Sequence, residues 1–186
     1  MNVIQKIVQQ YNGEYIEFPK KEMHTHAGKH GIQPQLGKFE IEGRKFSISK
    51  NENIGVSFNG NGINKAFFEP YKIFLYLDKK YYDSINIYPK NNLNKIIAHL
   101  MSLIGFHKAK PIHKEYYFKG NMSLIEALIK QSEFTKNLTN TRLFISISKD
   151  HAQKIMLIEE KGELDLVNFI KYSTLLSIIE KQINYT

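Results

Sequence analysis

The stretch Phe39-Glu40-Ile41-Glu42-Gly43-Arg44-Lys45-Phe46-Ser47-Ile48 decides the class of fold that this sequence favours. Apolar residues alternate with charged or polar residues on both sides of Gly43-Arg44. An alternation with a period of two is typical of a strand with one buried face, and a glycine between two such strands indicates a turn. The stretch therefore predicts a β-hairpin, in which strands that are neighbours in the sequence pair antiparallel.

The same alternation recurs along the chain, and it is interrupted by segments with helical spacing. We expect further strands at residues 14–18, 54–58, 71–77, 85–88 and 116–118, and a second hairpin over residues 142–159. Apolar residues at i, i+3 and i+4 predict helices over residues 2–11, 93–104, 123–134 and 166–183.

Three details of this pattern make further predictions. Ser123 and Glu126 have the spacing of a capping box, which would begin the third of these helices. Residues 71–77 carry apolar side chains on both faces, which favours a central strand covered on both sides. Residues 19–37 show no periodicity and are expected to form a long polar loop.

Strands joined by short turns, with helices at intervals, predict an α+β fold. We expect a mostly antiparallel sheet with an N-terminal helix and three further helices in the second half. The length of 186 residues fits a single domain over residues 1–186, with one soft subdivision near residues 89–93.

Composition excludes several classes of site. The chain has no cysteine, so disulfides, thiolate zinc sites, iron–sulfur clusters and cysteine nucleophiles are absent. It also lacks a Gly-rich phosphate loop, a G-x-S-x-G nucleophile elbow and an H-E-x-x-H zinc motif. The first residues show no secretory signal, so we expect a cytoplasmic protein, and no apolar run is long enough to span a bilayer.

The net charge of +8 is concentrated in the middle of the chain. Residues 71–120 hold 9 lysines against 3 acidic residues and so supply +6 of the +8. Lysines with tyrosines nearby could bind phosphates and stack on bases, so one alternative is a nucleic-acid or anionic surface. Its candidate residues are Lys108, Lys110, Lys114 and Lys119. Only two of the 26 basic residues are arginines, which argues against bidentate phosphate recognition.

Three of the seven histidines lie within seven residues, at His24, His26 and His30. Neutral imidazole is the commonest protein ligand for transition metals, so a metal-dependent activity at these three residues is a second alternative. The remaining histidines and acidic residues supply no evident further ligand. We therefore expect no cofactor, and a divalent transition metal on this cluster is the one exception to test.

Residues 74–131 resemble a group of uncharacterised bacterial α+β domains. The resemblance is carried by Phe74-Leu75-Tyr76-Leu77, Ile85-Asn86-Ile87-Tyr88-Pro89 and Tyr116-Tyr117-Phe118-Lys119-Gly120-Asn121, followed by Leu124-Ile125-Glu126-Ala127-Leu128. Those domains carry a strand, a Gly-Asn or Gly-Asp corner and a helix in similar order. They have no established activity, so the resemblance implies no catalytic residues and favours a function other than catalysis.

The leading hypothesis is a non-catalytic protein that binds another protein. An immunity or inhibitor protein that neutralises a bacterial toxin fits the size and the lack of catalytic motifs. Aromatic residues dominate the energetics of protein interfaces, so an aromatic sheet face is the expected contact surface. Its candidate residues are Tyr76, Tyr88 and Tyr116.

Overall fold

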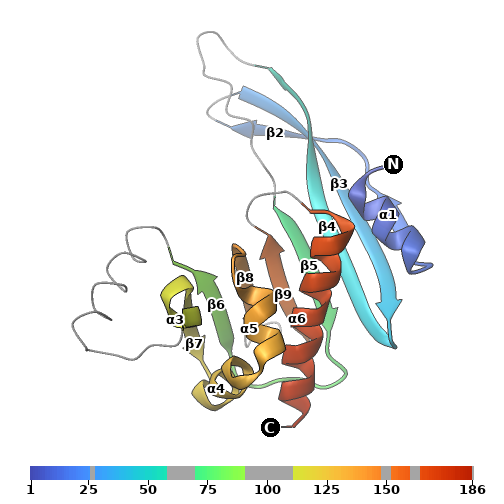
Figure 1. The fold of residues 1–186 in the computed structure, drawn as a ribbon. Helices are drawn as coiled ribbons and strands as arrows, with labels where there is room; N and C mark the ends of the chain where they lie inside the picture. Colours follow the sequence, from blue (N-terminus) through green and yellow to red (C-terminus); the bar gives the residue numbers. More distant parts are fainter. Residues whose placement is uncertain (26–27, 58–69, 91–110, 148–151, 160–163, 186) are drawn as a thin grey trace.

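A computed structural model of the chain describes residues 1–25, 28–57, 70–90, 111–147, 152–159 and 164–185 (Figure 1). Within these residues nine strands form one sheet, and every pairing in it is antiparallel. Eight of them follow the order β1-β3-β4-β5-β9-β8-β6-β7, and β2 pairs with β3 beside this path. The strands are β1 (Glu14–Glu17), β2 (Lys21–Thr25), β3 (Gly28–Ile41), β4 (Arg44–Ser57), β5 (Tyr71–Tyr76), β6 (Ile85–Pro89), β7 (Tyr116–Gly120), β8 (Leu143–Ile147) and β9 (Lys154–Glu159).

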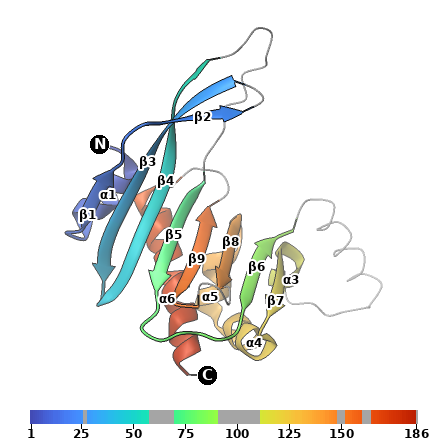
Figure 2. The ribbon, with the colours of Figure 1, turned by 180° about the vertical axis from the view of Figure 1, so that it is seen from behind.

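The helices of the described residues all pack on one face of this sheet. They are α1 (Val3–Gln10), α3 (Pro111–Glu115), α4 (Met122–Lys130), α5 (Ser132–Leu138) and α6 (Leu166–Asn184). Figure 1 looks onto the helices, and Figure 2 shows the strands from the opposite side with the helices behind them. The predicted fold class is confirmed: the protein is an α+β protein with an antiparallel sheet, an N-terminal helix and further helices in the second half.

The hairpin of β3 and β4 has the predicted position, with its turn shifted by one residue. Ile41 pairs with Arg44, so the turn residues are Glu42 and Gly43 instead of Gly43-Arg44. Both have a positive φ, 51° for Glu42 and 77° for Gly43. Two positive φ values match the twist of a two-residue hairpin, and glycine adopts them without strain.

One hydrophobic core lies between the sheet and the helices. In β5 the buried residues face the helices, and Ile73 and Leu75 are fully buried there. Helix α1 lies close against β3 at Gly37, where a Cβ atom would come within 2.6 Å of Val8 and 3.0 Å of Ile4. Glycine is needed at this position because the helix approaches the strand so closely.

Three predicted elements differ from the structure. Residues 19–37 are not a loop, because β2 and most of β3 lie there and pair with each other. Residues 54–57 belong to β4 and do not form a separate strand. The helix expected over residues 123–134 is two helices, α4 and α5, and Asn121 instead of Ser123 caps α4 by accepting a hydrogen bond from the Leu124 N–H (3.0 Å).

Strand β5 is central in the sheet, as predicted, but its second face is not covered by the described helices. Lys72 and Tyr76 are exposed on that face while Phe74 is half-buried. The helix predicted over residues 93–104 and the turn predicted at residues 59–62 lie outside the described residues. The soft subdivision predicted near residues 89–93 begins at Pro89, the last residue of β6. Its residues 91–93 also lie outside the described residues.

Candidate functional site: the open face of the sheet

The face of the sheet that points away from the helices is the most distinctive surface of the described chain. We call the part of it formed by β4 to β9 the open face, and its positions follow from the alternation along each strand and the register between the strands. Its residues are Lys45, Ser47, Ser49, Lys72, Phe74, Tyr76, Asn86, Tyr88, Tyr117, Lys119, Phe144, Ser146, Lys154, Met156 and Ile158.

Apolar side chains form the centre of the open face. Phe74 pairs with Met156, and Ile158 pairs with Phe144 on the next strand. The Phe144 side chain is 38% exposed although it lies in the middle of the sheet, and the other three are half-buried. Interaction sites often carry large apolar side chains that stay accessible, which makes this cluster a candidate site.

Tyrosine rings lie next to this centre. Tyr76 is 44% exposed, and its hydroxyl lies 3.1 Å from the Ser47 hydroxyl. Tyr88 and Tyr117 are cross-strand partners whose ring centroids are 5.3 Å apart. These contacts fix the orientation of the rings, so little side-chain entropy would be lost when they contact a partner.

The charge of the open face is positive. Four of its positions are lysines, Lys45, Lys72, Lys119 and Lys154, and none is Asp or Glu, although Glu40 of the adjoining β3 pairs with Lys45. The Lys154 ammonium lies 4.9 Å from the centroid of the Phe74 ring. Lys90, at the end of β6, lies 4.6 Å from the Tyr117 ring, and partial burial lowers the pKa of its ammonium. The face therefore favours a partner with negative charge.

Two of the three tyrosines predicted for protein binding lie on the open face, Tyr76 and Tyr88. The third, Tyr116, is a correction, because it points to the helices and is only 1% exposed. Its hydroxyl donates to the Thr141 carbonyl oxygen (2.6 Å) and accepts from the Leu143 N–H (3.3 Å). Burial raises the pKa of Tyr116, which holds the turn before β8 in place and is not available to a partner.

The lysines predicted for anion binding do not gather at one place in the described chain. Lys119 is exposed on the open face, whereas Lys114 is half-buried in α3. Lys108 and Lys110 lie outside the described residues. Positive charge on this surface comes instead mainly from lysines of β4, β5 and β9, which the sequence alone does not single out.

The histidine cluster lies at the hairpin of β2 and β3. His24 pairs with Lys29, and His30 pairs with Met23. His26 lies outside the described residues. No group of three or more His, Asp or Glu residues that could hold a metal is found among the described residues. The metal site at these histidines therefore stays a prediction.

Sequence reasoning missed the apolar centre of the open face. Phe144, Met156 and Ile158 alternate with the core residues of their strands, and this alternation was visible. The outward set of each strand is the more polar one, with Ser146 in β8 and Lys154 in β9. Periodicity therefore indicates the buried face, but it cannot show that the apolar residues of the other face gather at one place, which depends on how β5, β9 and β8 pair.

Comparisons with protein-family models, with curated proteins and with solved structures gave no match. In the described residues, no helix is both long and apolar enough to cross a membrane.

Proposed function

We propose that this protein is a non-catalytic binding module that holds an acidic protein surface on its open face. The observation that supports this is the arrangement of Phe74, Phe144, Met156 and Ile158 at the centre of a face that carries lysines and no carboxylate. Protein interfaces have an apolar core and a polar rim, with aromatic residues supplying most of the binding energy.

The same face could bind single-stranded nucleic acid, since bases stack on exposed rings and lysines neutralise phosphates. Two features favour a protein partner. Aliphatic Met156 and Ile158 occupy the centre of the face, where they offer no ring for stacking. Neither of the two arginines is on the face, and arginine is the residue best suited to phosphates.

An immunity or inhibitor protein is one form of this proposal, in which the acidic partner is a toxin encoded by a neighbouring gene. A cytoplasmic location belongs to the same proposal, since the complex would form where both proteins are synthesised.

The experiment measures binding of the purified products of neighbouring genes to the protein and to two double variants. Phe144→Ser with Ile158→Thr removes apolar area from the open face. Val167→Ser with Ile170→Ser is the matched control, because these residues of α6 are 75% and 47% exposed on the helical side. We expect one gene product to bind, with affinity at least about tenfold weaker for the open-face variant and unchanged for the control.

Three results would overturn the proposal. None of the gene products binds, or the two double variants bind equally well. Alternatively, a single-stranded oligouridylate binds the open face at physiological salt, which would assign the face to nucleic acid.

A further inference from the structure

A polar pocket of about 360 Å³ lies on the helical side of the sheet, away from the open face. It is formed where three segments meet: the turn between α5 and β8, the end of β9 and the beginning of α6. Its lining residues are Asn140, Thr141, Arg142, Glu159, Leu164, Asp165, Asn168, Lys171 and Tyr172.

Two carboxylates belong to the lining. Glu159 is 3% exposed and pairs across the sheet with Leu143, so its side chain is on the helical side among buried residues. Asp165 caps α6, and its Oδ1 accepts a hydrogen bond from the Asn168 N–H (2.7 Å). A carboxylate has about four lone-pair sites, so the hydrogen bond from the Asn168 N–H leaves acceptor capacity on the Asp165 side chain.

Two cations belong to the lining as well. Arg142 precedes β8 and is exposed, and Lys171 lies half-buried on α6, one turn after Asn168. Among the described residues of the lining, the four formal charges cancel and Leu164 is the single aliphatic residue. A net-neutral pocket with both signs of charge suits neither a simple anion nor a simple cation.

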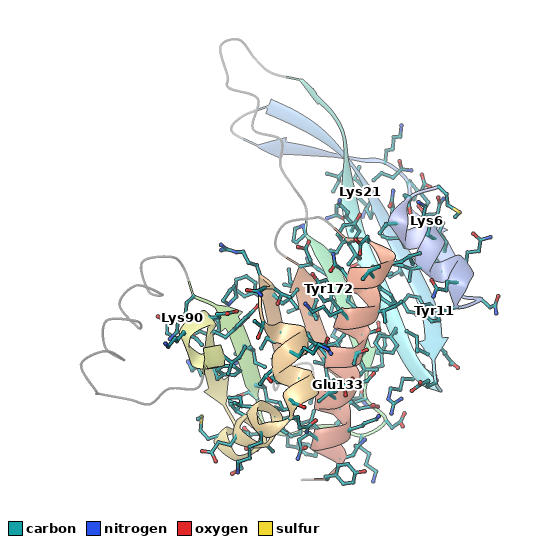
Figure 3. All side chains as sticks on the ribbon, viewed as in Figure 1. Lys6, Tyr11, Lys21, Lys90, Glu133 and Tyr172 are labelled. Atoms are coloured by element: carbon teal, nitrogen blue, oxygen red, sulfur yellow. The ribbon has the colours of Figure 1, made fainter. Side chains whose placement is uncertain are left out.

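Tyr172 adds a hydroxyl to the pocket from the N-terminal half of α6 (Figure 3). Burial and the nearby carboxylates of Glu159 and Asp165 raise the pKa of Tyr172 to about 12. The phenol is therefore protonated at neutral pH and can donate one hydrogen bond. Together with the amides of Asn140 and Asn168, it offers uncharged hydrogen bonds around the four charges.

We propose that this pocket binds a free α-amino acid. The ligand carboxylate would lie against Arg142 and Lys171, and the ligand ammonium against Glu159 and Asp165. A volume of about 360 Å³ is at the small end of ligand sites, which suits one amino acid better than a nucleotide. A zwitterion matches the charges of the lining because it presents one group of each sign and no net charge.

The test uses the full chain and each of the L-amino acids in turn, with isothermal titration calorimetry as the readout. We expect at least one amino acid to bind with a millimolar or lower dissociation constant. The N-acetyl and the C-terminal amide derivatives of that amino acid each lack one charge and should bind at least about tenfold more weakly.

Variants connect the binding to the pocket. Arg142→Gln and Tyr172→Phe are expected to weaken binding at least about tenfold and about threefold respectively. Lys181→Gln, at the other end of α6, is the matched control and should bind like the unchanged protein. Arg142 is exposed, so its variant is expected to fold, and thermal unfolding of each variant checks this.

The proposal is overturned if no amino acid binds, or if both derivatives bind as tightly as the free amino acid. Equal affinity of Arg142→Gln and Lys181→Gln would also overturn it, since the ligand would then be elsewhere. Binding of inorganic phosphate or of a monosaccharide without any amino acid would assign the pocket to another chemical class.

Discussion

Arg44 and Glu180 form an ion pair that joins the first hairpin of the sheet to the last helix. The Arg44 guanidinium donates from Nε to the Glu180 carboxylate and also lies 3.4 Å from Glu42. Glu180 is 7% exposed, so its charge is stabilised chiefly by this pair. A buried carboxylate without a partner is strongly destabilising, which makes the pair a determinant of how α6 is placed on the sheet.

Tyr172 makes the stability of the fold depend on pH. Its pKa is about 12 in the folded protein against 10.0 ordinarily, so between these values the unfolded chain binds fewer protons. The contribution is fully present below pH 10 and is lost as pH rises through 12. One pKa unit corresponds to about 1.4 kcal/mol. As pH rises from 10 to 12, we therefore expect the free energy of unfolding to fall by about 2 kcal/mol less in Tyr172→Phe than in the unchanged protein.

Urea unfolding between about pH 9 and about pH 12 measures this difference. Tyr82→Phe is the control, because it makes the same chemical change at a side chain that is 81% exposed. If the free energy of unfolding of Tyr172→Phe changes with pH in the same way as that of the unchanged protein, the buried phenol does not cause the pH dependence.

At the scale of the elements, a prediction concerns which residue caps the N-terminus of α4. Asn121 accepts the Leu124 N–H, whereas Ser123 is exposed inside the first turn of the helix. Loss of a side-chain cap typically destabilises by about 1 kcal/mol. We therefore expect Asn121→Ala to lower the free energy of unfolding by about that amount, and Ser123→Ala to change it by less than about 0.5 kcal/mol.

Chemical denaturation of both variants decides between the two caps. A larger loss of unfolding free energy for Ser123→Ala than for Asn121→Ala would support the capping box that the sequence predicts at Ser123. Equal effects would mean that neither side chain caps the helix alone.

The elements that the sequence predicted are those whose own residues carry the pattern. The hairpin over residues 142–159 and the helices at both ends have regular apolar spacing, and the structure confirms them. Residues 28–37 do not have it, since Gly31, Pro34 and Gly37 interrupt the segment. Their strand conformation comes from pairing with β2 and β4, and such tertiary pairing overrides local propensity.

At the scale of the whole molecule, the sequence does not show the order of the strands in the sheet. In β8, Leu143 and Ile145 alternate with Phe144 and Ser146, so periodicity indicates the buried face. The pairing of Phe144 with Ile158, and of Met156 with Phe74, comes from the strand order of the fold. Tyr76 and Tyr88 lie on the open face, whereas Tyr116, on the strand next to that of Tyr88, is buried.

The open face makes a prediction about stability that is separate from any partner. Phe144 is 38% exposed and Ile145 is 1% exposed, although they are neighbours in the same strand. We expect Phe144→Ser to lower the free energy of unfolding by about 1–2 kcal/mol, because more than a third of the residue stays in contact with water after folding. Ile145→Ser leaves a cavity and buries a hydroxyl, so we expect a loss of at least about 3 kcal/mol.

Urea denaturation at two protein concentrations measures both variants. Similar losses for Phe144→Ser and Ile145→Ser would mean that the open face is covered in solution. If those losses grew with protein concentration, the cover would be a second copy of the chain, because only association makes stability depend on concentration. If the loss for Phe144→Ser is smaller than that for Ile145→Ser and does not depend on protein concentration, the apolar centre is accessible in solution. A binding surface for a different protein requires this accessibility.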